Sequence, residues 1–328
     1  MANTTTTQVP SAVSEFYDRT LLVRALPYLA HDKFGQRRPL PKNNSKVIKF
    51  RKYASLAPAT TPLTEGTTPT GSQLSVSDIT ATIAQYGDVV TLTDMVTLVN
   101  VESPLVEAAE LLGEQAGNTL DQVYRDVLVA GTSVIYANGK SARNAVVDLI
   151  STTDLDKAIR LLKNNNATMH TSIIKAGTGI GTQPIRAAFF AIVHPDVEYT
   201  LEGLTGYTSV DKYASQGPAV EGEIGAYKNI RFVASTNAKI WTGAGAASTS
   251  VKNTAGNADV YATLIFAKDA YGITELRGEG LRNIVKQLGS AGTADPLDQR
   301  CTSGWKATTV CKILNDSFMV RIESAAAL

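Results

Sequence analysis

The stretch that decides the fold lies between residues 46 and 94. It reads KVIKFRKY (46–53), then, after Ala54, SLAPATTPLTEGTTPTGSQLS (55–75), then VSDITATIAQYGDVVTLTD (76–94). The two outer pieces alternate in the manner of strands. Loops longer than about 12–15 residues are uncommon and are usually functional or disordered. We therefore predict one long hairpin over residues 46–94. An isolated hairpin is marginal in water, so we expect its partner to be another chain.

A long helix is predicted over residues 103–131. Ser103 is expected to be its N-cap, Pro104 its first residue and Gly131 its end. At 1.5 Å per residue the helix would be roughly 40 Å long, which suits the spine of a flat molecule. An apolar stripe at three-to-four spacing is formed by Leu105, Ala109, Leu112, Ala116, Leu120, Tyr124 and Val127 or Leu128. The opposite, acidic face is expected to carry Glu107, Glu110, Glu114 and Asp121.

The region before the hairpin is rich in basic residues. A first helix is expected from Ser14 to Pro27, and the stretch from there to Lys52 has only one acid, Asp32. Two interpretations stay open for this stretch. It is either a solvated linker or a charged arm that lies on an acidic neighbour.

From about residue 150 helices and strands alternate. A helix is predicted from Thr153, a buried strand over AAFFAIV (187–193) and a short helix over HPDVEYTLEG (194–203). Further strands are predicted over NIRFVAS (229–235), NAKIW (237–241), VYATLIFA (260–267) and NIVKQLG (283–289). The whole chain is therefore expected to be of the α+β class.

The composition offers little for catalysis or metal binding. Net charge is +1, the three histidines are far apart, and the two cysteines form no Cys-x-x-Cys pair. The glycine-rich segments GTGIGT (177–182) and GAGAAS (243–248) fit neither G-x-G-x-x-G nor a P-loop. We interpret the HPD at 194–196 as a helix-start signal rather than as a catalytic His–Asp pair. We expect no cofactor, no metal, no enzyme activity and no membrane span.

Several segments, taken in order, carry a resemblance to a known family. In the C-terminal third they are GSAGTADPLDQR (289–300), GWKA (304–307), ILND (313–316) and VRIES (320–324). Earlier segments are SEFYDRTLLVRALPYLAHDKFG (14–35), PLTEGTTPTG (62–71), the long helix and AIVHPD (191–196). Together they resemble the major capsid proteins of tailed bacteriophages with the Hong Kong 97-type fold. The sequence looks closest to the family typified by coliphage N-four.

The resemblance implies a division of the chain and a function. The implied parts are an N-terminal arm (1–45), an extended-loop hairpin (46–94), a peripheral domain (95–150 and 258–328) around a spine helix, and an α/β axial domain (151–257). The protein would self-assemble, as hexamers and pentamers, into the icosahedral shell around the double-stranded DNA of a tailed phage. The long hairpin would then reach over a neighbouring subunit.

The resemblance also implies the subunit contacts. Residues of the arm and the loop are expected to touch adjacent subunits, and the acidic helix face with Glu107, Glu110 and Glu114 is one expected partner. The expected contact residues are Arg37, Arg38, Lys49, Arg51, Pro58, Leu63 and Glu65.

Further partners follow from the same resemblance. They are a portal protein, decoration proteins and DNA held without sequence specificity. Only about 45 residues precede the hairpin, so we expect a separate scaffolding protein. Assembly is expected in the host bacterial cytoplasm, with the protein then in the virion. Two alternatives are an encapsulin-type compartment shell and an α/β nucleotide-binding enzyme that uses the glycine-rich segments.

Cys301 and Cys311 lie in one segment, CTSGWKATTVC. If this segment is one continuous strand, ten steps of about 3.3 Å place the two residues too far apart for a bond within the chain. Two alternatives remain. Each cysteine forms a disulfide with another subunit, or both are ordinary free thiols, as in most proteins made in a reducing cytoplasm.

Overall fold

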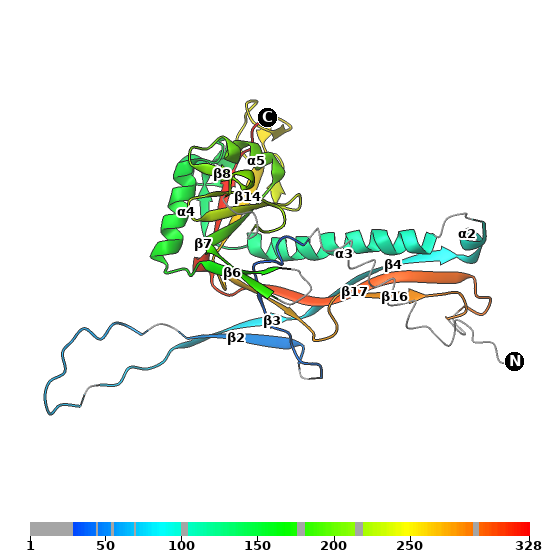
Figure 1. Ribbon diagram of the computed structural model, residues 1–328, viewed down its shortest axis with the longest axis horizontal. Coiled ribbons are helices and arrows are strands. Elements are labelled where there is room, and N and C mark those ends of the chain that lie inside the picture. The colour runs from blue at the N-terminus through cyan, green and yellow to red at the C-terminus, as the bar shows by residue number, and fades with distance from the viewer. Residues whose placement is uncertain are drawn as a thin grey trace.

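The protein is an elongated α+β molecule with a compact lobe on one side of a long, flat body (Figure 1). This computed structural model describes residues 29–43, 45–53, 56–68, 70–99, 104–175, 181–213, 219–290 and 295–328. The helix expected from Ser14 to Pro27 and the expected cap Ser103 lie outside the described residues. The predicted α+β class is confirmed.

Helix α3 (Pro104–Val129) runs along the flat body beside β4 and β17 (Figure 1). Most of the predicted apolar stripe is buried: Ala109, Leu112, Ala116, Leu120, Tyr124 and Leu128. The prediction for Asp121 was wrong. This residue was expected on the exposed acidic face, but it is fully buried because the N-terminal segment covers it.

A five-stranded sheet lies against α3. Its order is β1 (Gln36–Arg37), β15 (Tyr271–Glu275), β17 (Arg300–Ile313), β16 (Arg282–Lys286), and β4 (Ala84–Thr93) pairs with β17. The long strand β17 supplies Trp305, Ala307 and Cys311 to the same core cluster as Leu120 and Tyr124 of α3. This cluster fixes the helix to the sheet.

The hairpin is shorter than predicted. Strand β2 (Val47–Tyr53) pairs with β3 (Val76–Thr82), from Val47 opposite Thr82 to Tyr53 opposite Val76. At the buried residue Ile83 the chain leaves this ladder, and β4 pairs with β17 instead of with the first strand. The alternating pattern of residues 76–94 predicted strands correctly but could not tell which strand each half would join. Helix α2 (Asp94–Val99) follows and was not predicted.

The compact lobe is built on a nine-stranded sheet. Its main order is β5 (Val134–Tyr136), β18 (Met319–Ser324), β14 (Val260–Phe266), β7 (Gly181–Val193), β10 (Ile230–Ala234), β9 (Glu223–Tyr227) and β8 (Tyr207–Ser209). Strand β11 (Ile240–Trp241) pairs with β14, and β6 (His170–Lys175) pairs with β7. Smaller elements are β12 (Asn253–Thr254), β13 (Asn257–Ala258), η3 (Ala137–Gly139), η4 (Arg143–Ala145), η5 (Val210–Lys212) and η7 (Asp316–Phe318).

The two faces of this sheet pack against different helices. Phe190 and Ile192 of β7 belong to the core cluster that contains α3. Their neighbours Phe189 and Val193 belong to the cluster that contains α4 (Thr152–Asn164) and α5 (Pro195–Glu202). Because side chains alternate along a strand, the apolar run AAFFAIV serves both cores at once.

The nine-stranded sheet continues across residues 150 and 258, where the resemblance implies domain boundaries. Strands β14 and β18 lie beyond residue 258 and β5 before residue 150, yet all three pair within the nine-stranded sheet. Every residue of β14 and β18 is buried. A uniformly buried strand belongs in the centre of a covered sheet, and this sheet offers that position.

A buried ionic cluster ties the end of α3 to β18. The last turn of α3 carries no basic residue. Arg321 of β18 supplies a positive charge there instead. It donates hydrogen bonds to the carbonyl groups of Val129 and, at 3.0 Å, of Gly131. Glu323 is fully buried and accepts hydrogen bonds from Arg321 at 2.8 Å and from Arg143 at 2.7 Å. The cluster satisfies carbonyl groups that a helix end leaves free.

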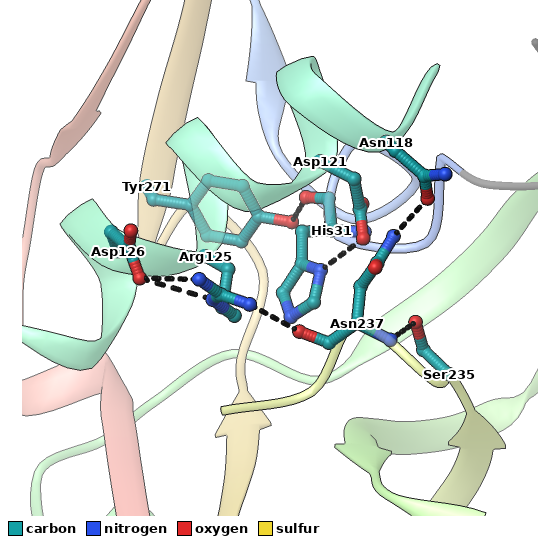
Figure 2. A network of polar contacts seen from close by, with 8 residues as sticks. All are labelled: His31, Asn118, Asp121, Arg125, Asp126, Ser235, Asn237 and Tyr271. Carbon is teal, nitrogen blue, oxygen red and sulfur yellow. Dashed lines mark hydrogen bonds and ion pairs between the residues drawn. The ribbon is translucent and has the colours of Figure 1, made fainter. Parts of the chain in front are cut away.

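The described start of the chain, residues 29–43, forms a strap against α3 and β15. Its β1 pairs in parallel with β15. The backbone N–H of His31 donates to Asp121 at 2.8 Å, and His31 Nδ1 lies 2.9 Å from the other Asp121 oxygen (Figure 2). The Tyr271 hydroxyl donates to the His31 carbonyl at 2.5 Å. These residues are fully buried, so the strap is bound to its own chain.

Both cysteines lie in β17, so the predicted continuous strand is confirmed. Each is only 3% exposed. Burial raises the pKa of the Cys301 thiol, and it raises that of Cys311 to about 12. A thiol that is covered by its own chain and stays protonated is a poor partner in disulfide exchange. The geometry favours free thiols over bonds between subunits.

Asp121→Asn is expected to lower the free energy of unfolding by about 3 kcal/mol, because it leaves the buried His31 contacts without their carboxylate. Chemical denaturation of the unassembled chain measures this. Asp126→Asn is the matched control, because its carboxylate lies on the same helix with 55% of the side chain exposed. The control should cost less than about 1 kcal/mol. Equal losses in the two variants would contradict the role of Asp121.

The cysteine geometry gives a second prediction. On a denaturing gel without reductant, assembled particles should run as a single monomer band, unchanged by dithiothreitol. Both thiols should react with an alkylating reagent only after the chain is unfolded. Dimers or ladders that collapse with reductant would show that intersubunit disulfides form after all.

Candidate subunit-contact surfaces

The hairpin tip, residues 56–75, extends beyond the β2–β3 ladder. Every described residue in it is exposed, including the expected contact residues Pro58, Leu63 and Glu65. Leu63 is 79% exposed and Leu74 is 68% exposed. The backbone hydrogen bonds found within the described part of the tip are local, such as Thr67 N–H to the Thr64 carbonyl at 3.2 Å. The tip therefore extends into solvent in the isolated chain.

Two of the four expected contact cations are engaged within the chain. Arg37 pairs with Asp32 in the strap. Arg51 pairs with Asp78 across the β2–β3 ladder at 3.1 Å, and this hydrogen bond lowers the pKa of Asp78. Arg38 and Lys49 are exposed, the first on the strap and the second on β2. These two are the better candidates for contacts with another copy.

A groove between β4 and α3 was not predicted. Its volume is about 590 Å³, and Leu111, one of the residues that line it, is 60% exposed. The apolar lining residues are Val90, Leu92, Pro104, Ala108, Leu111 and Leu112. The successive valines Val89 and Val90 are the feature of the sequence that indicates such an apolar surface, because a strand with one face in solvent should not carry apolar residues at successive positions.

The rim of this groove is acidic. Asp88 and Glu107 lie along it, and Glu107 is exposed. Gln115 donates to Asp88 at 2.6 Å, which lowers the pKa of that carboxyl, and it accepts from the Trp305 indole at 3.1 Å. Glu110 and Glu114 of the expected acidic face are partly exposed on the same helix.

The elements that line the groove, β4 and the first half of α3, lie toward one end of the molecule, and the hairpin tip lies at the other end (Figure 1). Strand β4 and the start of α3 point one way along the longest axis, and β2, β3 and the tip point the other way. A chain cannot place its own tip in its own groove. Each chain thus presents an extended loop at one end and an open apolar groove at the other.

The HPD motif and the GAGAAS segment both have structural roles. His194 caps α5, as its HPD motif predicted, by accepting a hydrogen bond from Asp196 N–H at 3.1 Å. In GAGAAS, a side chain at Gly245 would come within 2.3 Å of the Val146 carbonyl, so packing requires glycine there. Most of GTGIGT lies outside the described residues.

The described part of the chain contains no group of three or more His, Cys, Asp or Glu side chains that could hold a metal ion. None of the helices in the described ranges has the length and hydrophobicity of a membrane span.

Solved structures with a similar fold are phage capsids. The capsid of Ralstonia phage GP4 matches with a TM-score of 0.65 and 12% identity, over 90% of this chain and 87% of that one. The capsid of cyanophage P-SCSP1u matches with a TM-score of 0.60 and 17% identity, over 90% and 88%. Cyanophage Pam1 matches with a TM-score of 0.59 and 14% identity, over 93% and 92%.

A family model described as phage capsid protein matches residues 76–269 of the sequence. The sequence has no significant match among curated proteins. The match to the family model covers more than half of the chain, from the second strand of the hairpin to the centre of the compact lobe. It identifies a structural shell protein rather than an enzyme: the chain belongs to the phage capsid protein family.

Proposed function

We propose that this major capsid protein builds the icosahedral shell of a tailed phage through the Hong Kong 97-type fold, with the coliphage N-four family as its nearest relatives. The family match and the similarity in fold over about nine-tenths of the chain support this proposal. The observation that carries it is the hairpin tip, whose described residues include exposed leucines and make local backbone hydrogen bonds. A surface of this kind fits a protein that is completed by its neighbours.

In this proposal each part of the chain is assigned to a domain by the sheet to which it belongs. In this proposal α3 is the spine helix of a peripheral domain, together with the five-stranded sheet. The compact lobe is the axial domain, and it includes β5, β14 and β18 as well as residues 151–257. The strap is the base of the N-terminal arm, and residues 46–82 are the extended loop.

The subunits associate head to tail in this proposal. The tip of one copy lies on the next copy, and the groove between β4 and α3 is the apolar surface that its leucines suit. Different surfaces meet in such a contact, so repetition closes a ring when the rotation allows it. Arg38 and Lys49 would approach the acidic rim with Asp88 and Glu107. Exposed pairs contribute at most about 1 kcal/mol each, so the apolar contact dominates.

The charge of the chain suits a container for DNA. A net charge of +1 gives weak attraction for a polyanion, and contacts to phosphates are sensitive to salt. We propose that DNA is enclosed without sequence-specific contacts. Portal, scaffolding and decoration proteins are the further proposed partners, with assembly in the host bacterial cytoplasm. Particles that contain cargo enzymes instead of DNA would favour an encapsulin-type compartment.

Replacing residues 54–75 by Asn-Gly, which forms a tight two-residue turn, tests the role of the tip. The variant is expected to stay soluble with an unchanged circular dichroism spectrum and melting temperature, because every described residue of the tip is exposed. It should fail to form shells in electron micrographs and in sedimentation.

A second variant tests whether assembly needs only the length of the tip or also its leucine side chains. A glycine–serine tip of the original length keeps the reach but removes the leucines, and it should also fail to assemble. Normal shells from either variant, or unfolding of the shortened chain as a monomer, would disprove the role assigned to the tip.

A further inference from the structure

Strand β4 has an open edge. On one side it pairs with β17 over its full length, from Ala84 opposite Thr309 to Thr93 opposite Arg300. On its other side none of the described strands pairs with it. A free strand edge presents a row of backbone N–H and C=O groups that can pair with another chain.

The ladder with β17 shows which residues face the open edge. The Asp94 N–H donates to the Gln299 carbonyl at 3.0 Å and continues this ladder. Because hydrogen-bonded residues alternate along an antiparallel pair, the even-numbered residues of β4 bond to β17. The odd-numbered residues face the open edge, and all of them are exposed: Gln85, Gly87, Val89, Thr91 and Thr93. The N–H of Val89 has a local acceptor, the Asp88 carboxylate at 2.8 Å.

The same edge is occupied one step earlier in the chain. Strand β3 leads into β4 with only Ile83 between them, and the Ile83 N–H donates to the Lys46 carbonyl at 3.0 Å. This odd-numbered residue therefore faces the β2 side, where β2 begins at Val47. The chain covers its own edge as far as Ile83 and leaves it open along β4.

The open edge lacks the features that usually prevent pairing. Natural edge strands often carry lysine, proline or a bulge. Strand β4 reads AQYGDVVTLT, with no lysine, arginine or proline and with Asp88 as its one charged residue. Its ladder with β17 runs without a shift in register. An edge of this length and composition is suited to receive another strand.

The hairpin tip contains a segment that suits this edge. Residues 70–75, TGSQLS, are exposed, carry no charge and have no regular secondary structure. No backbone hydrogen bond joins them to another part of the described chain. The earlier part of the tip suits the edge less well, because Pro58, Pro62 and Pro69 have no N–H to donate.

We propose that residues 70–75 of a neighbouring copy add to the open edge of β4 as a further strand. The inference rests on the head-to-tail contact proposed above and states how that contact is made. In this mode of recognition the backbone hydrogen bonds supply affinity, and pockets for alternate side chains supply specificity. The groove lies on the face of β4 that carries Val90 and Leu92. Leu74 of the added strand points to this face and packs against Val90 and Leu111.

Hydrogen–deuterium exchange resolved to single residues measures the pairing. In the unassembled chain the amides of Gln85, Gly87, Thr91 and Thr93 should exchange freely. In purified shells at least two of them should exchange at least about ten times more slowly, because a strand partner now accepts their hydrogen bonds. The amides of Tyr86 and Val90 are the internal control. They bond to β17 and should be protected in both states.

A pair of proline variants tests the partner segment. Ser72→Pro/Gln73→Pro removes two successive N–H donors, so one of them faces β4 whichever way the added strand runs. This variant keeps Leu74, should melt like the wild type when unassembled, and should fail to build shells. Thr60→Pro/Thr61→Pro is the matched control. It carries the same change in the same exposed tip, outside the pairing segment, and should assemble normally.

The proposal is overturned if the amides of the open edge stay unprotected in shells, or if Ser72→Pro/Gln73→Pro assembles like its control. Should both proline variants fail to assemble, the exchange measurement decides. Failure of this inference is distinct from failure of the proposed function. If the tip acts through its side chains alone, the glycine–serine tip still prevents assembly while the edge amides stay unprotected. Shells built by the glycine–serine tip would contradict the proposed function itself.

Discussion

Helix α3 has to bury one apolar stripe against two sheets at the same time. Leu112, Leu120 and Tyr124 pack in one cluster with Trp305 of the five-stranded sheet and with Phe190 of the nine-stranded sheet. The stripe thereby holds the flat body and the compact lobe together as one molecule. A helix of about 40 Å is long enough to make both contacts, and Arg321 closes its C-terminal end from the central strand β18. The strap is attached to the same helix by the hydrogen bond from the His31 N–H to Asp121.

The surfaces proposed for contacts with other copies are the hairpin tip and the groove between β4 and α3. The hairpin tip and the groove beside β4 are open in the isolated chain, and they lie at opposite ends of its longest axis (Figure 1). A capsid subunit has to be stable before assembly and yet keep surfaces that only assembly buries. Here the buried core supplies the first property, and the two ends are the surfaces that we propose for the second.

Local patterns in the sequence predicted many of the elements. The stripe of α3, the strand AAFFAIV, the helix start at His194 and the continuous strand from Cys301 to Cys311 all follow from the spacing or the capping residues of nearby sequence. Pairing between distant segments could not be predicted in this way. The pattern of VYATLIF says that the strand is buried, but not that its neighbours are β7 and β18. In the sequence, Asp121 cannot be distinguished from the acidic residues on the surface of the helix, because its partner, His31, lies far away along the chain. The groove likewise depends on contacts between distant residues.

The central claim is that the hairpin tip has no partner in its own chain and gains one in the shell. Hydrogen–deuterium exchange of residues 56–75, in the unassembled chain and in purified shells, tests it directly. We expect the tip amides to exchange without protection in the unassembled chain and to become protected in shells, while the amides of β17 are protected in both. Protection of the tip in the unassembled chain, or its absence in shells, would show that the tip does not gain its partner by assembly.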